Sequence, residues 1–228
     1  ERIDNGVTAP RATGAHSWTG TGFLSVDGER GLGPVVAMHA LAAIEARAHD
    51  SGIAMAAIHN SNHIGMLAWY GEQVAAKGLV LIAMTTSEAL VHPWGGRRAM
   101  LGTNPICIAV PAVPKPLVLD MATSLVAMGK IHDYASRGEP LRDGWALDAR
   151  GDPTTNAAAA KIGAIAPFGG AKGYALGVAL EVLVASLSGS AIGTDVVGTL
   201  DSTEICNKGD VFIVVAPKRA AAVEQLIS

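Results

Sequence analysis

A histidine with an apolar segment on each side is the first candidate for chemistry in this chain. His63 ends the triplet Ser-Asn-His, after the apolar segment 53–59 and just before the apolar segment 66–78. Side chains at the end of a buried strand leave the sheet and meet solvent or a ligand. The positive end of a following helix opposes a charged imidazolium, so the pKa of His63 is expected near or below neutrality. Such a group can take and give a proton, although a histidine that only caps a helix fits the same pattern.

Three further segments combine glycines or strand ends with charged side chains. Residues 93–105, PWGGRRAMLGTNP, hold two glycines beside two arginines, which suits an anion or an ordinary surface loop. Residues 119–124, LDMATS, place Asp120 at a strand end, where it can cap a helix, hold a ribose hydroxyl or assist a catalytic group. Residues 167–177, PFGGAKGYALG, surround Lys172 with glycines, which suits a phosphate or an exposed lysine.

The usual signatures of nucleotide, hydrolase and metal sites are missing from the sequence. We find no GxxxxGK[ST] loop, no GxSxG elbow, and no His, Cys and Asp residues with the spacing of zinc ligands. Residues 31–36, GLGPVV, contain two glycines of a dinucleotide fingerprint but lack the third. No metal site is therefore predicted, and a nucleotide would have to be held in another way.

Composition indicates a globular protein with a large core. Half of the 228 residues are hydrophobic, 16% are charged, and the net charge of −3 comes without the basic block that would favour nucleic acid. Cys107 and Cys206 lie far apart, so we expect reduced thiols in a cytoplasmic protein. The apolar segment 173–193 is interrupted by Glu181, which predicts a helix buried on most faces rather than a membrane span.

Apolar periodicity predicts the elements that must position these residues. Helices are expected at 34–50, 66–78, 122–138 and 173–189 and from Pro217 onward, and strands before the Asp27-Gly28 turn and at 53–59, 79–86, 105–111, 116–120 and 210–217. Strands 105–111 and 116–120 are close enough to pair as a hairpin. Thr123 or Ser124 is expected to cap the third helix, and residues 138–161 are interpreted as polar and turn-rich. The alternation of helices and strands indicates one α/β domain.

The order of these segments resembles that of the malate/L-lactate dehydrogenase family, which lies outside the Rossmann group. Eight collinear segments carry the resemblance: DGERGLGPVV, NSNHIG, GGRRAMLGTNPI, LDMATS, GKI, GWALDARGDPTT, PFGGAKGYAL and NKGDVFI. The resemblance implies an NAD(P)-binding domain of the α+β kind, with a mixed, largely antiparallel sheet flanked by helices. It also implies a homodimer whose active site lies near the subunit boundary.

The resemblance assigns roles to individual residues. His63 matches the family's acid/base histidine beside the nicotinamide, and Ile64 takes the place of the usual aromatic residue. Contacts with the cofactor are implied for Ile64, Gly65, Ser87, Asp120, Met121, Ala122, Thr123 and Lys172, with the Asn207–Asp210 turn as a further match.

The implied activity is the interconversion of a small 2-hydroxy acid and its 2-oxo acid with NAD or NADP. Malate, lactate, sulfolactate and ureidoglycolate are the substrate types in question. Glu88 favours NAD, because an acidic group near the adenosine ribose disfavours a 2′-phosphate.

Two alternatives stay open at this point: a catalytically inactive nucleotide-binding or scaffold protein, and a reductase of cyclic imine carboxylates. The family's N-terminal helical segment, with its Ser-His-Gly motif and an arginine for the substrate carboxylate, is absent from this sequence. Its absence favours the first alternative and counts against the second.

Overall fold

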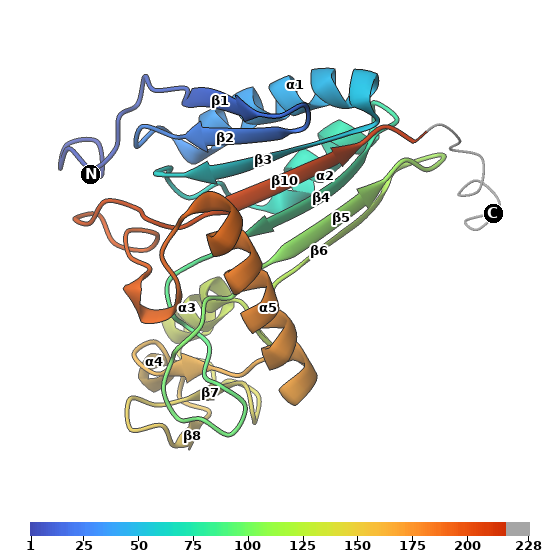
Figure 1. Ribbon diagram of the computed structural model, residues 1–228. Helices are drawn as coiled ribbons and strands as arrows, with labels where there is room; N and C mark the ends of the chain where they lie inside the picture. The colour runs from blue at the N-terminus through green and yellow to red at the C-terminus, as the bar shows by residue number, and fades with distance from the viewer. Residues whose placement is uncertain (218–228) are drawn as a thin grey trace.

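A seven-stranded sheet with the strand order β1-β2-β3-β10-β4-β5-β6 forms the centre of the computed structural model, which describes residues 1–217 (Figure 1). The strands are β1 (Ala15–Thr19), β2 (Phe23–Asp27), β3 (Ile53–His59), β4 (Val80–Thr85), β5 (Ile106–Val110), β6 (Leu117–Met121) and β10 (Asp210–Val215). All neighbours pair antiparallel except β2 and β3, which run parallel. The predicted mixed, largely antiparallel sheet and the β5–β6 hairpin are therefore confirmed. The helix predicted from Pro217 lies outside the described residues.

Helices cover both faces of this sheet. α1 (Gly33–Ser51) and α2 (Leu67–Ala75) pack on one face, and α5 (Ala171–Ser188) packs on the other (Figure 1). Successive residues of a strand point to opposite faces, so Ile58 of β3 joins the core under α1 and α2 while its neighbour Ala57 packs against α5. The two cores explain why the strands read as almost continuous apolar runs.

Local sequence rules account for the ends of the first helices. Pro34 lies in the first turn of α1, where a missing N–H costs nothing, and Gly52 ends the helix with a left-handed φ of 83°. The helix predicted at 34–50 and the strand predicted at 53–59 are confirmed. The segment 66–78 is helical only to Ala75, because its last three residues form a turn.

A small lobe built from two short helices and a three-stranded sheet lies below the main sheet in Figure 1. Its elements are α3 (Met128–Arg137), β7 (Ala146–Leu147), β8 (Pro153–Thr154), α4 (Ala157–Ala160) and β9 (Ala164–Ile165). They enclose a separate apolar core that includes Ile131 and Ile165. The interpretation of residues 138–161 as merely turn-rich missed β7, β8 and α4, since elements of two to four residues carry no periodic signal.

The helix predicted at 122–138 is wrong in its first turn and a half. It begins only at Met128, so neither Thr123 nor Ser124 caps it. The amide of Thr123 donates instead to the carbonyl of Thr103, at 2.8 Å. This bond ties the end of β6 to the loop before β5 and keeps the chain extended there, which competes with helix formation.

α5 is buried along one side only, which contradicts the prediction that most of its faces are covered. Its buried residues include Leu180, Glu181 and Val184, whereas 51% of Val182 and 44% of Leu183 are exposed. Within residues 1–217, α5 is the one helix long and apolar enough to cross a membrane by length and composition. That the protein has no membrane partner stays a prediction.

Glycines before and at the start of α1 allow two backbones to touch. A Cβ atom at Gly33 would lie 2.3 Å from the carbonyl oxygens of both Asn62 and His63, and one at Gly28 would lie 2.6 Å from the Cβ of Ser61. The first turn of α1 therefore rests directly on the backbone that carries the candidate histidine. This contact, rather than a dinucleotide fingerprint, is the physical reason for the glycines of DGERGLGPVV.

Replacing Gly33 by alanine should destabilise the protein, because the new methyl group overlaps two carbonyl oxygens held by the sheet. We expect a loss of about 1–3 kcal/mol in the free energy of unfolding, measured by urea denaturation. Gly129→Ala in α3 is the matched control, since nothing lies within 4 Å of an added Cβ there. Equal stability of Gly33→Ala and the wild type would show that the close approach is not required.

Candidate active site

One edge of the main sheet gathers nearly all the residues predicted to form the site. β2, β3, β4 and β6 end at this edge, and β5 and β10 begin there. The predicted residues follow those strand ends: His63, Ile64 and Gly65 come after β3, Ser87 comes after β4, and Asp120, Met121, Ala122 and Thr123 close β6. Segments far apart in the sequence are thus brought to a common place by strand pairing.

The imidazole of His63 is exposed to solvent and is held by its own loop. Its Nδ1 accepts a hydrogen bond from the backbone N–H of Gly65 at 3.0 Å, which assigns the proton of the neutral ring to Nε2. Partial desolvation by the surrounding protein lowers the pKa of His63 below 6.5, the charge of Lys208 lowers it further, and that of Asp210 opposes the change. The direction of the predicted pKa shift is confirmed, but its causes are desolvation and Lys208 rather than the start of α2, which begins only at Leu67.

Two cavities lie on either side of the loop that carries His63. The first, of 310 Å³, is called the polar cavity after its polar side chains Glu1, Arg2, Thr8, Asn62, His63 and Thr199, although Ile3, Leu32 and Pro34 also line it. The apolar cavity, of 320 Å³, is bordered by Pro34, Ile64, Gly65, Met66, Trp69 and Tyr70. Pro34 lines both. His63 lines the polar cavity, and the residues that follow it, Ile64 and Gly65, line the apolar one, so the loop can serve a small acid in the first space and a flat apolar ring in the second.

Asn62 holds this loop through four hydrogen bonds. Its Nδ2 donates to the carbonyl oxygens of Arg30 at 2.9 Å and Gly31 at 2.7 Å, and its Oδ1 accepts from Arg2 Nε and Thr8 Oγ1, both at 3.0 Å. The side chain is buried and its polar capacity is fully used. The sequence shows Asn62 only as the neighbour of the histidine. Its role could not be predicted, because its partners come from segments 31 or more residues away.

Asp120 caps a helix, but not the one that follows it in the chain. Its Oδ2 accepts a hydrogen bond of 2.7 Å from the backbone N–H of Ala68, 52 residues earlier, in the first turn of α2. The carboxylate thereby ties β6 to the helix that begins just after His63. The capping role expected for Asp120 is correct, its assignment to the next helix is wrong, and its contact with a cofactor stays a prediction.

Ser87 belongs to a chain of hydroxyl groups at the same edge. Its Oγ accepts from the backbone N–H of Thr103 at 3.0 Å and lies 3.3 Å from the Thr103 hydroxyl. The Thr123 hydroxyl in turn donates to the Thr103 carbonyl at 2.9 Å. Thr103, which sequence reasoning missed, therefore links two of the residues implied to contact the cofactor.

A buried carboxylate from α5 fixes the loop in front of β5. Glu181 is 2% exposed and accepts hydrogen bonds from the N–H of Gly102 at 3.1 Å, from Asn104 Nδ2 at 2.5 Å and from the N–H of Gly193. Three donors satisfy the charge that burial would otherwise penalise. Glu181 was noted in the sequence only as an interruption of an apolar helix, and its partners explain why it is there.

Two further buried charges stand at the start of β10. Lys208 and Asp210 are 1% and 0% exposed, and Lys208 Nζ lies 2.5 Å from Asp210 Oδ1. The Asn207–Asp210 turn matched the family only as a motif in the sequence. The structure shows that it brings an ion pair to the edge where His63 lies.

Lys172 is not beside His63. It is exposed in the first turn of α5, on the face of the sheet opposite α2, and it borders neither of the two cavities around the His63 loop. The glycines next to it serve close packing, because a Cβ at Gly173 would lie 1.7 Å from the carbonyl oxygen of Phe168. The contact of Lys172 with the cofactor stays a prediction.

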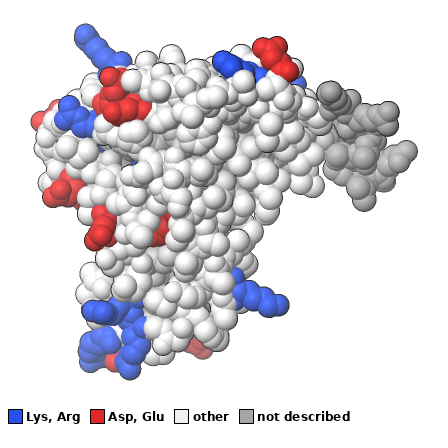
Figure 2. All heavy atoms as spheres, in the orientation of Figure 1, with Lys and Arg blue, Asp and Glu red and all other residues white. Residues whose placement is uncertain are grey.

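The paired glycines and arginines of residues 93–105 form a surface loop. Arg97 donates to the carbonyl of Gly151 at 3.1 Å and forms an ion pair with Asp152, so its charge is already neutralised. In Figure 2 the largest group of Lys and Arg side chains on the visible face lies at the lower end of the small lobe. Of the two interpretations of this loop, the structure favours the ordinary one.

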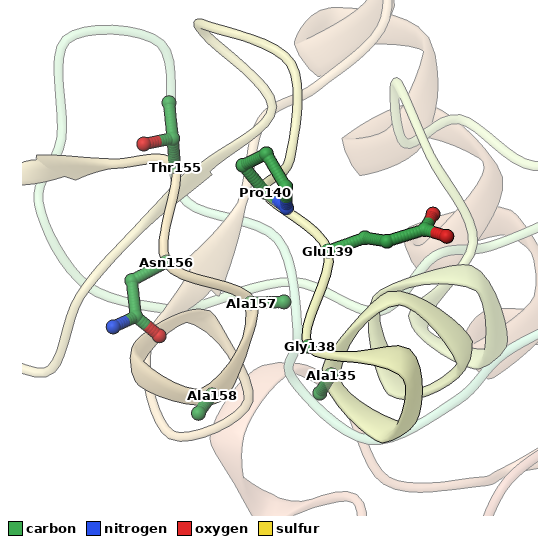
Figure 3. Close-up of a pocket in the computed structure, with 8 residues that line it drawn as sticks. All are labelled: Ala135, Gly138, Glu139, Pro140, Thr155, Asn156, Ala157 and Ala158. Atoms are coloured by element: carbon green, nitrogen blue, oxygen red, sulfur yellow. The ribbon is translucent and has the colours of Figure 1, made fainter.

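A separate cavity of 390 Å³ in the small lobe lacks chemical groups for catalysis (Figure 3). Alanines and Asn156 line it, and its one ionisable side chain, Glu139, pairs with Arg137 at 3.2 Å. Within the described residues, no group of three or more His, Cys, Asp or Glu side chains is placed to hold a metal ion. At the edge around His63, by contrast, an acid/base side chain lines a cavity.

Comparisons with known proteins identify relatives of this chain. A family model described as malate/L-lactate dehydrogenase matches residues 1–228. The L-sulfolactate dehydrogenase of Methanothermobacter thermautotrophicus is 36% identical over 218 residues, which cover 96% of this chain and 62% of the relative. The chain thus spans less than two thirds of that relative's length.

Solved structures give the same picture. A dehydrogenase from Sinorhizobium meliloti is 52% identical with a TM-score of 0.95, covering 99% of this chain and 67% of that one. The Δ1-piperideine-2-carboxylate reductase of Pseudomonas syringae is 30% identical with a TM-score of 0.91, covering 99% of this chain and 71% of that one.

Replacing Asn62 by alanine should cost far more stability than its size suggests, because four hydrogen bonds are lost and buried partners are left unpaired. We expect a loss of about 2–4 kcal/mol in the free energy of unfolding, measured by urea denaturation. Asn5→Ala, which removes one exposed bond to the Ser202 carbonyl, is the control and should change it by less than about 0.5 kcal/mol. Similar losses in the two variants would refute the role given to Asn62.

Proposed function

This chain belongs to the malate/L-lactate dehydrogenase family, and from that premise we propose that it interconverts a small 2-hydroxy acid and its 2-oxo acid with a nicotinamide cofactor. The observation that carries the proposal is the loop at the sheet edge whose His63 lines one cavity and whose next two residues line a second, apolar cavity. Relatives are named L-sulfolactate, malate and L-lactate dehydrogenases, and the acids in these names share the 2-hydroxy carboxylate unit.

The polar cavity suits the acid. Its volume of 310 Å³ is enough for a small carboxylic acid, and its wall carries both a cation, Arg2, and an anion, Glu1. The backbone of His63 is fixed by Gly33 and by Asn62, so the imidazole has a defined position beside that space. Binding in this cavity would bring the C2 oxygen of the acid next to the histidine.

The apolar cavity suits the nicotinamide ring. Ile64, Met66 and Trp69 give it apolar walls, and the backbone of Gly65, with φ of 76°, leaves room that a side chain would fill. When bound, the cofactor gives or takes the hydride at C2 of the acid. Asp120 holds the first turn of α2, and thereby the floor of this cavity, through its bond to Ala68.

His63 handles the proton that accompanies the hydride. In reduction of a 2-oxo acid, the imidazolium gives a proton to the carbonyl oxygen as C2 gains hydride, and in oxidation a neutral ring takes the hydroxyl proton. In the neutral ring the only nitrogen that can take the hydroxyl proton is Nδ1, so the bond from Gly65 must open before this transfer. The same bond stabilises the neutral form, so the ring readily gives up its extra proton.

NAD rather than NADP is the proposed cofactor. Glu88 Oε1 accepts hydrogen bonds from the N–H groups of Thr199 at 2.7 Å and Leu200 at 2.9 Å, which fixes the carboxylate after β4. A fixed negative charge there would accept ribose hydroxyls and repel a 2′-phosphate. One relative, 41% identical, is named as an NADP(+) enzyme, so the choice varies within the family.

A homodimer and a cytoplasmic location are further parts of the proposal. The exposed apolar side chains Val182 and Leu183 on the outer side of α5 support a partner subunit there. Cys107 and Cys206 are free and buried, and burial raises the pKa of Cys107 to about 12, which fits unreactive thiols in a reducing compartment.

A reductase acting on cyclic imine carboxylates is the second candidate. The 30% identity and TM-score of 0.91 to a Δ1-piperideine-2-carboxylate reductase favour it. The same cavities and the same histidine would serve, because reduction of a protonated imine also delivers hydride to the carbon next to a carboxylate.

Replacing His63 by glutamine separates catalysis from cofactor binding. We expect turnover of 2-oxo acids with NADH to fall by about 10²–10⁴-fold, because the positioned proton donor is lost. The dissociation constant for NADH, followed by its fluorescence, should stay nearly unchanged. His132→Gln, an exposed histidine on α3, is the control and should keep full activity.

Each proposal has its own contrary result in these assays. Full turnover in His63→Gln removes His63 from the mechanism, and tighter binding of NADPH than of NADH overturns the choice of NAD. Binding of NADH by the wild type without turnover of any acid supports the inactive alternative. Turnover of cyclic imine carboxylates alone supports the second candidate.

A further inference from the structure

We propose that the buried Lys208–Asp210 ion pair sets the proton affinity of His63 from beneath the site, so that both side chains are positioning residues for proton transfer. Neither side chain can touch a ligand, since they are 1% and 0% exposed. The inference deepens the proposed function, but its test measures His63 directly and does not depend on activity.

Strand pairing places this ion pair next to the histidine loop. Asp210 is the first residue of β10 and pairs with Ile58 in β3, five residues before His63, and with Thr85 in β4 on its other side. The side chains of Asp210 and Phe212 share the face of the sheet that carries α2, because alternate residues of a strand point the same way. The pair therefore lies on the His63 side of the sheet.

Side-chain packing continues this connection to the loop. Phe212 meets the ring of Tyr70 edge to face, with ring centroids 5.5 Å apart. The hydroxyl of Tyr70 donates to the carbonyl oxygen of Ile64 at 2.6 Å, one residue beyond His63. Burial raises the pKa of Tyr70 above 10, and the charge of Asp210 raises it further, so the field of this carboxylate reaches the start of α2.

The ion pair is incomplete in a way that stability does not explain. Asp210 Oδ1 is bonded to Lys208, but Oδ2 is buried without a hydrogen-bond partner among the described residues. A buried ion pair is often no more stable than apolar residues of the same volume, and an unsatisfied oxygen adds to its cost. A costly charge pair beside an acid/base group is therefore a candidate for function.

The two charges act on His63 with opposite signs. The ammonium of Lys208 disfavours an imidazolium and lowers the pKa of His63, whereas the carboxylate of Asp210 favours it. Other titratable or charged groups around the loop and the start of β10 are His59 at the end of β3, Glu1 and Arg2 on the polar cavity, Tyr70 on α2, Asp120 at the first turn of α2, and Cys206 before β10. Exposed charges such as Glu1 are screened by salt, whereas the buried pair is screened much less.

NMR titration of the imidazole resonances in high salt tests the proposal without substrate or cofactor. The signal of His63 is identified by its loss in His63→Gln, since the chain has 7 histidines. Lys208→Met should raise the pKa of His63 by about 0.5–1, because the opposing charge is gone. Lys208→Met/Asp210→Asn, which removes both charges and keeps the shape, should raise it by less.

A control variant and the double variant ensure that the titration decides the proposal. Lys77→Met breaks the Lys77–Glu45 pair of 2.6 Å at the far end of α2 and should leave the pKa of His63 unchanged. If Lys208→Met does not fold, because it leaves a buried carboxylate unpaired, the double variant alone decides. A pKa of His63 equal to the wild type in every variant that folds overturns the proposal. In active preparations, the acid limb of the pH profile of kcat/KM should move in the same direction as the NMR pKa.

Discussion

The four hydrogen bonds of Asn62 are the constraint on which the candidate site depends. They join the end of β3 to the β2–α1 turn and to the N-terminal segment, and the contact of Gly33 with the same backbone leaves the loop no freedom to slide. An amide with all its donors and acceptors used is stable in a buried place, whereas one missing partner would cost roughly 1–3 kcal/mol. His63 is the next residue, so its backbone inherits this fixed position.

Charged groups at the same edge secure the site from three directions. Asp120 reaches from β6 to the first turn of α2, Glu181 reaches from α5 to the loop before β5, and the Lys208–Asp210 pair lies at the start of β10. Asp120 and Glu181 each join segments that are distant in the sequence, and the Lys208–Asp210 pair places two buried charges near the loop of His63. The exposed imidazole of His63 thus lies on a support that these charged groups hold in place.

Elements with strong periodicity could be predicted from the sequence, and so could the position of His63 at a strand end. The strand at 53–59 and the helix at 34–50 owe their structure to local apolar patterns and end signals, which the structure confirms. The tertiary partners could not be predicted in the same way. Asp120 satisfies its carboxylate 52 residues away, and Thr123 pairs its amide with Thr103 instead of starting a helix, because backbone pairing across the edge prevails over local capping.

Predictions of ligand contacts from residue type were least successful where a charged side chain has a protein partner that the sequence does not reveal. Arg97 looked available to an anion until Asp152 of the small lobe was placed beside it, and the glycines around Lys172 serve the close packing of Gly173 on Phe168. Conversely, Asn62 and Asp210 gained roles because burial turned ordinary polar residues into fixed ones. Which polar side chains become buried is decided by the whole fold, and local sequence does not carry that information.

The position of the His63 loop between two cavities is the central claim, and a crystal structure of the protein with bound NADH and a 2-oxo acid tests it most directly. The account predicts the nicotinamide ring in the cavity lined by Ile64, Gly65 and Trp69, with a nitrogen of the His63 imidazole within about 3 Å of the C2 oxygen of the acid. A nicotinamide ring bound elsewhere, for example near Lys172 at the start of α5, or an imidazole turned away from the acid would contradict it.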